Sequence, residues 1–331
     1  MSFNFFLSTL ILNILFLLSF NYVSKRFNLY DLPDNSRKIH KKKISLIGGF
    51  LFYFFCIIYF LSYLFGSIEV FFSFKETVSL FLFSSIFFCV GLYDDKFNLN
   101  PNTKLYLMLL ISLCLITFNN DFSVKELNFS FTSKAIYLGN FSILFTIICF
   151  ICFVNACNMF DGIDLQFGFY LIVLSVIFLS KGLMTNFYLG LLICTIFFLY
   201  NNYKKKIFIG NNGTLFLGFL FSFLFIGSYN KANIFFVDEI FLIMAIPGID
   251  LIRVSILRIL NGKHMFQPDN LHIHHLLIRK INTLQTNLLI QTSVILPILI
   301  YYLGINFFIC LLLSLAIYLF IIFFARGLNK Q

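Results

Sequence analysis

Residues 140–182 read NFSILFTIICFICFVNACNMFDGIDLQFGFYLIVLSVIFLSKG. Two apolar runs, 140–157 and 165–182, lie on either side of a short polar string. Each run approaches the roughly 20 apolar residues that a helix needs to cross the hydrocarbon core of a bilayer. Because a segment in lipid has to satisfy its own backbone polar groups, helices are the expected form. The stretch therefore predicts two membrane-spanning helices joined by a loop of amides and carboxylates.

The same pattern recurs along the chain. Nine further spans are expected near 3–24, 46–65, 74–93, 105–119, 185–201, 213–229, 235–260, 284–303 and 305–325. The 235–260 segment is the least regular, since it begins with Asp238 and Glu239 and contains Pro247; it is either a broken helix or a helix that leaves the bilayer. The expected fold class is all-α, a polytopic membrane helix bundle of about eleven spans in a single domain, residues 1–331.

Lysine and arginine fall mainly on one side when these spans alternate. The side that holds Lys25 to Lys43 carries nineteen of the 24, and the other side carries five. By the positive-inside rule, the N-terminus lies outside and the C-terminus in the cytoplasm, as expected for the bacterial inner (cytoplasmic) membrane. The net charge of +10 follows from this topology and also favours anionic lipids and substrates. Nucleic-acid binding is disfavoured, because no soluble basic domain exists to carry it.

The groups capable of chemistry gather on the cytoplasmic side. The chain is 60% hydrophobic and 11% charged, yet all five histidines and eight of the fourteen acids fall in loops on that side. This concentration indicates that the cytoplasmic loops form the functional face. The first candidates are Asp94 and Asp95, directly after an apolar span. Adjacent carboxylates repel each other and are tolerated best beside a cation; the alternative is a solvated turn or helix cap.

The loop between the spans 140–157 and 165–182 holds the strongest candidates. If the helix continues, Asn155, Asn158 and Asp161 lie on one face at i, i+3 and i+6, and Asp164 adds a second carboxylate. Oxygen ligands of this kind suit Mg²⁺, which is usually shared with substrate phosphates. A cluster of helix-capping residues is the alternative interpretation.

Two glycine turns and one basic loop are candidates for binding anions or sugars. Gly48-Gly49 and the turn 210–214 both stand at a predicted helix start, where backbone N–H groups can approach an anion. Arg37, Lys38 and His40 are placed to hold phosphate nearby. The lysines at 41–43 and 204–206 are typical of membrane topology and need no further role.

Three histidines, His272, His274 and His275, occur within four residues of the last cytoplasmic loop. Such a cluster beside a lipid surface is not the pattern of a packed core histidine. Zinc is one explanation. No cysteine or glutamate accompanies the cluster, so phosphate contact is favoured.

Together these loops resemble the polyprenyl-phosphate N-acetylhexosamine-1-phosphate transferases, a superfamily that includes phospho-N-acetylmuramoyl-pentapeptide transferase. The resemblance runs from about residue 31 to residue 280, and its order is Asp-Asp, Asn-x-x-Asn-x-x-Asp-Gly-x-Asp, then His-x-His-His. The His string after Asp269, following Pro247-x-x-Asp250, resembles the branch that starts O-antigen, common-antigen or teichoic-acid-type glycans of the cell surface and lipopolysaccharide.

The resemblance implies a specific reaction and site. A UDP-activated HexNAc, GlcNAc by default, gives its sugar 1-phosphate to undecaprenyl phosphate and releases UMP, with Mg²⁺ (or Mn²⁺) at a cytoplasmic cleft; a homodimer is also implied. The catalytic residues would be Asp94, Asp95, Asp161 and Asp164, and the metal ligands Asp94, Asp95, Asp161 and Asn211. The substrate-binding residues would be Arg37, Lys38, His40, Asn155, Asn158, Asn211, His272, His274 and His275. Direct attack and a covalent aspartyl intermediate both remain open.

The chain departs from the family pattern at three positions. Family members usually carry an aspartate, a metal ligand, where this chain has Asn211; a glycine where it has Leu165; and an arginine or lysine where it has Asn270. An active enzyme with altered metal or sugar preference is favoured, and a weak or inactive paralogue that binds lipid or nucleotide-sugar is the alternative. A transporter is disfavoured, because the charges sit at span ends instead of near the bilayer midplane.

Overall fold

The computed structural model describes residues 3–33, 42–68, 71–232, 234–263, 265 and 269–327. They form an almost entirely helical bundle with two short antiparallel hairpins, β1–β2 (Tyr30–Asp31 with Ile44–Ser45) and β3–β4 (Glu126–Leu127 with Ile136–Tyr137). The helices are α1 Phe3–Phe27, α2 Gly48–Leu64, α3 Phe74–Phe97, α4 Pro101–Phe118, α5 Ser142–Phe160, α6 Gln166–Ser180, α7 Thr185–Tyr203, α8 Gly210–Ala232, α9 Val237–Ile243, α10 Ala245–Leu260, α11 Ile273–Leu277, α12 Thr283–Tyr302 and α13 Phe307–Gly327.

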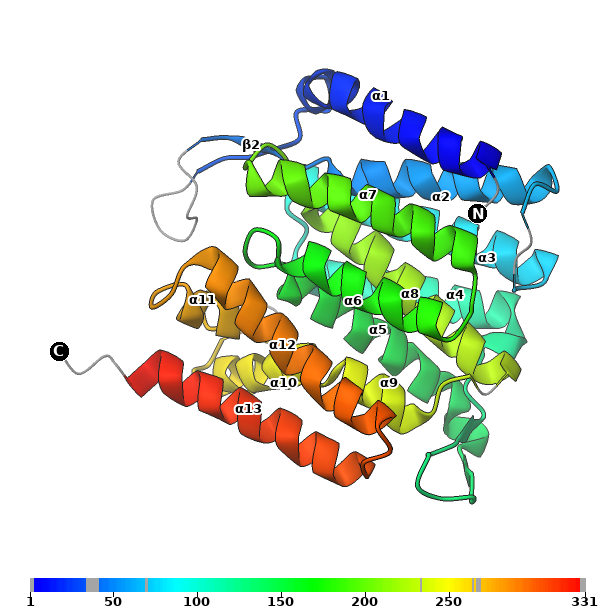
Figure 1. The fold of residues 1–331 in the computed structure, drawn as a ribbon, viewed down its shortest axis with the longest axis vertical. Coiled ribbons are helices and arrows are strands. Elements are labelled where there is room, and N and C mark those ends of the chain that lie inside the picture. Colours follow the sequence, from blue (N-terminus) through cyan, green and yellow to red (C-terminus); the bar gives the residue numbers. More distant parts are fainter. Residues whose placement is uncertain are drawn as a thin grey trace.

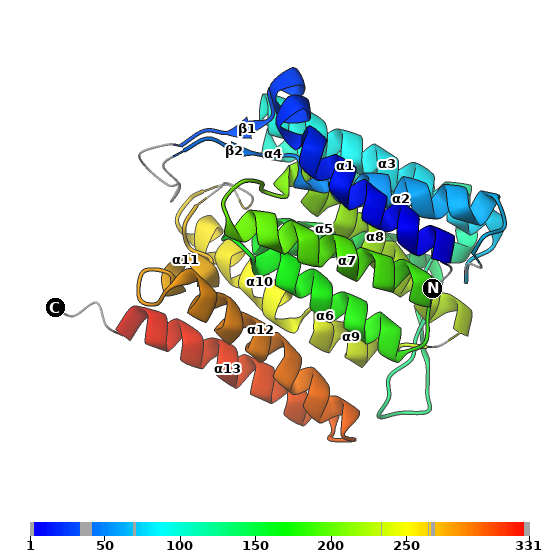
Figure 2. The same cartoon turned by 45° about the horizontal axis from the view of Figure 1, so that its top comes forward.

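The long helices run side by side, with α1 and α13 at opposite edges of the bundle (Figure 1). The chain starts at one end of the bundle and finishes at the other, and the β1–β2 hairpin and α11 lie at the finishing end in both views (Figures 1 and 2). We call this the cavity end, because the cavity of the candidate active site lies there. The opposite end carries the β3–β4 hairpin, and we call it the hairpin end. The all-α, multi-pass membrane prediction is confirmed.

The number of spans is less fully tested. Every predicted span coincides with a helix or, at 235–260, with the pair α9–α10. Within the described residues, seven helices are long and apolar enough to cross a membrane, or eight if that bent pair is one span; α2 and α6 are shorter apolar helices. The count of eleven therefore stays a prediction.

The pair α9–α10 resolves the irregular ninth segment. The two helices meet at an angle of 68° around Met244, so the segment is divided into two helices, as one of the two interpretations expected. Helix α10 turns its apolar face outward and its charged residues inward. Ile252, Ile256 and Ile259 are each more than half exposed. Asp250 and Arg258 are buried. An apolar face turned outward and charges turned inward fit a helix whose outer surroundings are hydrocarbon.

Helix α8 is the centre of the bundle. Its entire apolar segment is buried, and α2, α3 and α5 pack against it. Two glycines make the approach close. A Cβ at Gly91 of α3 would lie 2.3 Å from the Asn211 carbonyl oxygen, and one at Gly49 of α2 would lie 2.0 Å from the Asn212 side chain. Side chains at these positions would separate the helices, so the glycines bring the first turn of α8 against α2 and α3.

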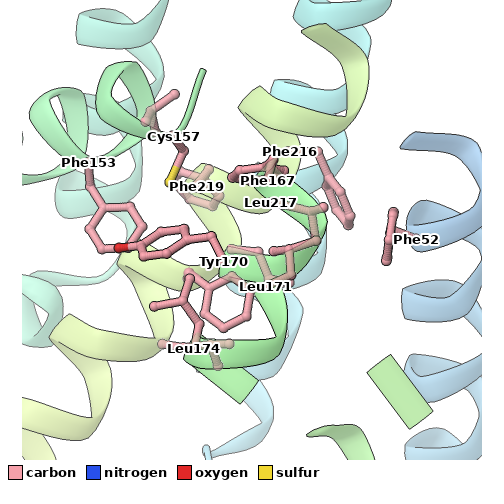
Figure 3. Close-up of a cluster of buried hydrophobic side chains, with 14 of the residues drawn as sticks. Phe52, Phe153, Cys157, Phe167, Tyr170, Leu171, Leu174, Phe216, Leu217 and Phe219 are labelled. Atoms are coloured by element: carbon pink, nitrogen blue, oxygen red, sulfur yellow. The ribbon is translucent and has the colours of Figure 1, made fainter. Parts of the chain in front are cut away.

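The core around α8 is aromatic and aliphatic (Figure 3). Phe216, Leu217 and Phe219 of α8 meet Phe167, Tyr170, Leu171 and Leu174 of α6, together with Phe153 and Cys157 of α5 and Phe52 of α2. Phe219 stacks on Phe150 with ring centroids 5.4 Å apart, and on Phe87 at 4.4 Å. This packing fixes the relative positions of the helix ends that carry the polar loops.

Candidate active site

A cavity of about 570 Å³ lies at the cavity end of the bundle, where β1, the α5–α6 loop, the α7–α8 loop and the segment 269–283 meet. Six predicted site residues line it: Asp95, Asn158, Asp161, Asp164, Asn211 and His275. The other described lining residues are Tyr30, Asp31, Leu32, Leu46, Asn98, Gly162, Ile163, Asn202, Lys205, Phe208, Ile209, Gly210, Thr214, Asp269 and Thr283. Loops more than 200 residues apart in the chain thus form one polar chamber.

Asp94 and Asp95 are adjacent in the sequence but bind different groups. The Asp94 carboxylate lies 2.8 Å from the Lys104 ammonium and accepts the Leu99 N–H at 2.9 Å. The Asp95 carboxylate accepts the backbone N–H groups of Asn211 at 2.8 Å and Asn212 at 2.9 Å. Asp95 therefore caps the first turn of α8, where the positive end of the helix dipole favours an anion.

The backbone of the two glycine turns is used by the protein itself. The N–H groups of Gly48 and Gly49 donate to the carbonyls of Phe208 at 2.9 Å and Ile209 at 3.0 Å. The prediction that Gly48-Gly49 cradles an anion is therefore wrong, because sequence could not show that a distant strand-like segment takes up these donors. At the α8 turn, Asp95 occupies two of the N–H groups, so the turn offers mainly side chains to the cavity.

Asn158 and Asn211 belong to one hydrogen-bonded group. The Asn158 side-chain amide donates to the Asn211 side-chain oxygen at 2.8 Å and to the Thr214 hydroxyl at 2.6 Å. Lys104 approaches the same Asn211 oxygen at 3.4 Å. The Asn211 oxygen therefore already faces an amide and an ammonium, which are donors and not metal ions.

Asp161 differs from every carboxylate above. Helix α5 ends at Phe160, so Asp161 lies at its C-cap and on the cavity wall. Its carboxylate has no hydrogen bond or ion pair within the described parts of the chain. Burial, with the nearby carboxylates of Asp164 and Asp95, raises the pKa of Asp161 from 3.8 to about 8. A partly buried carboxylate that has no partner among the described residues and lies near other acids is a group that a cation would stabilise.

Leu165, directly after Asp164, is one of the departures from the family pattern, which has glycine there. Leu165 has φ +73°, a left-handed conformation that favours glycine and costs another residue about 1–2 kcal/mol. Asn202 compensates locally: its side-chain oxygen accepts the Leu165 N–H at 2.6 Å, and its amide donates to the Ile207 carbonyl at 2.9 Å. Asn202 thus fastens the α5–α6 loop to the α7–α8 loop.

His272 lies inside a buried charge network. Its Nδ1 is 2.7 Å from the Asp250 carboxylate, and its Nε2 is 3.3 Å from the Arg258 guanidinium. Arg258 also donates to Asp269 at 2.7 Å. Because this network joins α10 to the segment before α11, His272 acts here as an anchor of that segment and is not among the cavity-lining residues.

His274 and His275 occupy different environments. His274 is 1% exposed, and burial, with His275 and His272 nearby, lowers the pKa of His274 well below its ordinary value. Its ring packs on Gly162, where a Cβ would lie 1.7 Å from Nε2. His275 lines the cavity. Among the described residues no group of three or more His, Cys, Asp or Glu side chains is arranged to hold a metal, so the zinc explanation gains no support.

The remaining predicted residues lie elsewhere. Asn155 donates to the Ile151 carbonyl of its own helix at 2.9 Å and is not among the lining residues. Arg37, Lys38 and His40 lie outside the described residues, and their role stays a prediction. Sequence analysis missed Lys104 and Asn202. The Asn201-Asn202 pair, which ends an apolar span as Asn155 and Asn158 do, was the available signal for Asn202.

Part of the chain is similar to a known protein family. The family model described as glycosyl transferase family 4 matches residues 77–229, the part of the chain from α3 to α8. This part of the chain is similar to that family. The matched part carries Asp94, Asp95, Asp161 and Asn211, so the centre of the cavity lies within the family region. The histidine segment lies beyond it.

Similarity to individual proteins extends over most of the chain. The chain is 27% identical over 262 residues to a "Probable undecaprenyl-phosphate N-acetylglucosaminyl 1-phosphate transferase" of Bacillus subtilis, which covers 76% of this chain and 70% of the relative. The undecaprenyl-phosphate alpha-N-acetylglucosaminyl 1-phosphate transferases of Escherichia coli K12 and Thermotoga maritima are 25% and 28% identical, over 82% and 81% of this chain and 75% and 79% of those relatives.

Proposed function

We propose that this protein transfers a HexNAc 1-phosphate, GlcNAc by default, from a UDP-sugar to undecaprenyl phosphate and releases UMP. The product would be the first lipid-linked intermediate of a cell-surface glycan of the O-antigen, common-antigen or teichoic-acid type. The names of the relatives support the sugar phosphate and the polyprenyl phosphate. The single observation that carries the proposal is Asp161, a carboxylate without a partner among the described residues, on the wall of a polar cavity at one end of a membrane bundle.

The chemistry requires two anions to meet. An oxygen of the lipid phosphate attacks the β-phosphorus of the UDP-sugar, and the bond from that phosphorus to the oxygen of the α-phosphate breaks, so that UMP leaves. Positioning and neutralisation of charge supply most of the rate in phosphoryl transfer. A cavity at the helix ends admits a water-soluble nucleotide-sugar and lies close to the membrane surface where a lipid phosphate resides.

The donor set fits a magnesium ion that is shared with the substrate. Asp161 would hold the ion through its unpaired carboxylate, with Asp164 beside it on the cavity wall. Mg²⁺ is commonly held by one or two carboxylates plus substrate phosphates and water, without a protein cage, which agrees with the lack of a three-residue cluster among the described side chains. When bound, Mg²⁺ supplies charge neutralisation of the diphosphate. Mn²⁺ would serve the same ligands.

The other cavity residues have roles that follow from their contacts. Asn158, fixed by Asn211 and Thr214, presents amide groups for the sugar or the nucleotide. His275 is exposed to the cavity and is suited to contact phosphate. Asp95 holds the first turn of α8 in place, and therefore positions Asn211 instead of reacting itself.

The orientation of the protein is part of the same proposal. Nineteen of the 24 lysines and arginines belong to the cavity side of the alternating topology, which favours a cytoplasmic cavity in the bacterial inner membrane and an outer N-terminus. UDP-sugars are made in the cytoplasm, so this orientation brings the cavity to the donor.

The test is UMP release by the purified protein, given undecaprenyl phosphate, Mg²⁺ and a panel of UDP-HexNAc donors. Asp161→Asn is the inactive variant, and Asp121→Asn, at an exposed acid of the hairpin end, is the matched control. Lipid-dependent UMP release that Asp161→Asn loses and Asp121→Asn keeps would support the proposal and name the donor. Binding of UDP-sugar without UMP release across the panel would favour the inactive paralogue, and sugar uptake into vesicles without lipid would favour a transporter.

A further inference from the structure

The described part of the cavity wall carries more acidic than basic side chains. Among its described lining residues are five aspartates, Asp31, Asp95, Asp161, Asp164 and Asp269, and a single lysine or arginine, Lys205. A substrate that brings a diphosphate into this chamber adds further negative charge. Basic groups that can compensate it have the largest effect in such a place, and on the described wall Lys205 is that group.

The backbone holds Lys205 in a specific and unfavourable conformation. Its φ is +52°, in the left-handed region that favours glycine. Two hydrogen bonds fix the turn: the Lys205 N–H donates to the Asn202 carbonyl at 2.8 Å, and the Lys206 N–H donates to the Asn201 carbonyl at 3.0 Å. Together the two bonds form the Schellman turn that commonly ends a helix, here α7, so the position of Lys205 is fixed.

The same asparagine joins this turn to the carboxylate loop. The Asn202 side chain accepts the N–H of Leu165 at 2.6 Å, the residue directly after Asp164. Leu165 and Lys205, both with left-handed backbones, are thus both bonded to Asn202. The turn therefore fixes the backbone of Lys205 relative to the loop that carries Asp161 and Asp164.

The side chain of Lys205 is not committed to its neighbour. Its ammonium lies 3.9 Å from the Asp164 carboxylate, and the side chain is 55% exposed. A half-exposed ion pair at this distance contributes little to stability, so a phosphate can replace the carboxylate at small cost. The exposure also places the ammonium at the aqueous rim, where a water-soluble substrate enters.

We propose that Lys205 binds the diphosphate of the nucleotide-sugar as it enters the cavity. This inference rests on the proposed function, and it assigns Lys205 to the soluble donor and not to the lipid phosphate. Of the three lysines at 204–206, Lys205 alone is among the cavity-lining residues and is assigned to the substrate. The other two keep their role in membrane topology.

The conformation of Lys205 permits a sharp experiment. Glycine prefers this φ, so Lys205→Gly removes the ammonium while relaxing the backbone. Lys205→Arg keeps the charge, and Lys204→Gln removes an adjacent exposed lysine that is not among the lining residues. Steady-state UMP release is measured while UDP-GlcNAc and undecaprenyl phosphate are varied in turn, alongside the thermal unfolding temperature and the Kd for UDP-GlcNAc by calorimetry.

Lys205→Gly is expected to raise the KM and the Kd for UDP-GlcNAc by ~10-fold, as for loss of one charge-assisted contact, with an unchanged KM for the lipid and an unfolding temperature at or above that of the wild type. Lys205→Arg should retain most of the affinity and Lys204→Gln all of it. Unchanged donor KM and Kd, a rise confined to the lipid KM, or an equal rise in Lys204→Gln would overturn the proposal.

The calorimetry separates this inference from the proposed function. If the wild type releases no UMP, the proposed function fails, and the Kd for UDP-GlcNAc and for UDP still tests Lys205. A weaker Kd in Lys205→Gly alone would support the binding role in a non-catalytic protein. Equal Kd values in all variants, or no binding by the wild type, would refute it.

Discussion

The two ends of the bundle differ in how their buried acids are neutralised. At the hairpin end, Glu76 is 2.5 Å from the Lys231 ammonium and Glu239 is 2.7 Å from that of Lys181. At the cavity end, Asp161 has no partner among the described residues, and its pKa is raised to about 8 by burial and by neighbouring carboxylates. Glu76 and Glu239 thus each have a lysine partner, whereas Asp161 has none among the described residues.

This difference indicates what each end is for. A buried acid without a partner costs stability, and such a cost persists where the group binds something that the folded chain does not supply. The paired acids join helix ends that are distant in sequence, α3 to α8 and α6 to α9. The hairpin end therefore serves the fold, and the cavity end serves binding.

The largest effect is expected at Asp161. Asp161→Asn should lower the rate of UMP release by ~10³-fold or more, equivalent to about 4 kcal/mol in the activation free energy, because the carboxylate that binds the cation is lost. The unfolding temperature should stay equal or rise, since an uncharged side chain of the same size replaces an acid that has no partner among the described residues. Rates and thermal unfolding in detergent are compared with Asp121→Asn. A fall in stability with activity retained would show that Asp161 is a structural acid.

The opposite outcome is expected at Asp238. This fully buried acid accepts the Ser130 N–H at 2.9 Å, the Ser130 hydroxyl, and the Tyr301 hydroxyl at 3.1 Å. Asp238→Ala leaves those donors unpaired, and should cost about 2–3 kcal/mol and lower the unfolding temperature, while the folded fraction keeps its activity. Asp121→Ala is the control at an exposed acid of the same end. Loss of activity without loss of stability would remove the contrast between the ends.

The third effect is a dependence of metal binding on pH. The folded protein holds the Asp161 proton up to about pH 8, above the ordinary pKa of 3.8. Because the folded state binds this proton more tightly than the unfolded chain, a rise in pH between those values lowers the stability contributed by this group, and it also frees the carboxylate for a cation. The apparent affinity for Mn²⁺ should therefore rise ~10-fold per pH unit from about 6 to 8 and then level off.

Electron paramagnetic resonance of free Mn²⁺ measures that affinity without any need for turnover. Asp161→Asn is the control, and its remaining Mn²⁺ binding should be weak and nearly independent of pH in this window. A wild-type affinity that stays constant from pH 6 to pH 8 would mean that Asp161 is already ionised or does not bind the cation.

The smallest effect is expected at Asn211. Asn211→Asp restores the carboxylate typical of the family, but its oxygen still faces the amide of Asn158 and the ammonium of Lys104. The new charge is then neutralised mainly by Lys104, so Mg²⁺ affinity should change by about 3-fold or less, the size of a partly screened charge. The activation constant for Mg²⁺ is measured for both forms. A gain of 10-fold or more would make position 211 a direct metal ligand.

Much of the fold was predictable because membrane helices are encoded locally. Each predicted apolar span corresponds to a helix or, at 235–260, to a pair of helices. Where a helix begins at another residue than predicted, a capping contact explains the difference. The span expected at 105–119 begins at Pro101, since the Asn100 side chain caps the helix by accepting the Asn102 N–H. The span expected at 213–229 begins at Gly210, since Asp95, 116 residues earlier than Asn211, caps it.

The candidate site was predictable in composition but not in roles. Sequence analysis could gather Asp95, Asn158, Asp161 and Asp164 on one side of the membrane, and all four line the cavity. It could not separate Asp94 from Asp95, because adjacent residues of a helix point in directions about 100° apart and meet different neighbours. It could not foresee that Gly48 and Gly49 donate to carbonyls at 208 and 209.

The sequence by itself determined the helical membrane fold and the side on which polar groups gather, because apolar length and charge asymmetry act through the bilayer, which responds to composition and not to contacts. Only the tertiary structure decided which polar group remains unpaired. That property depends on partners supplied from far along the chain, such as Lys104 for Asp94 and α8 for Asp95. Asp161 lacks such a partner among the described residues, and Lys205 has only a loose one; this is where the protein is open to a ligand.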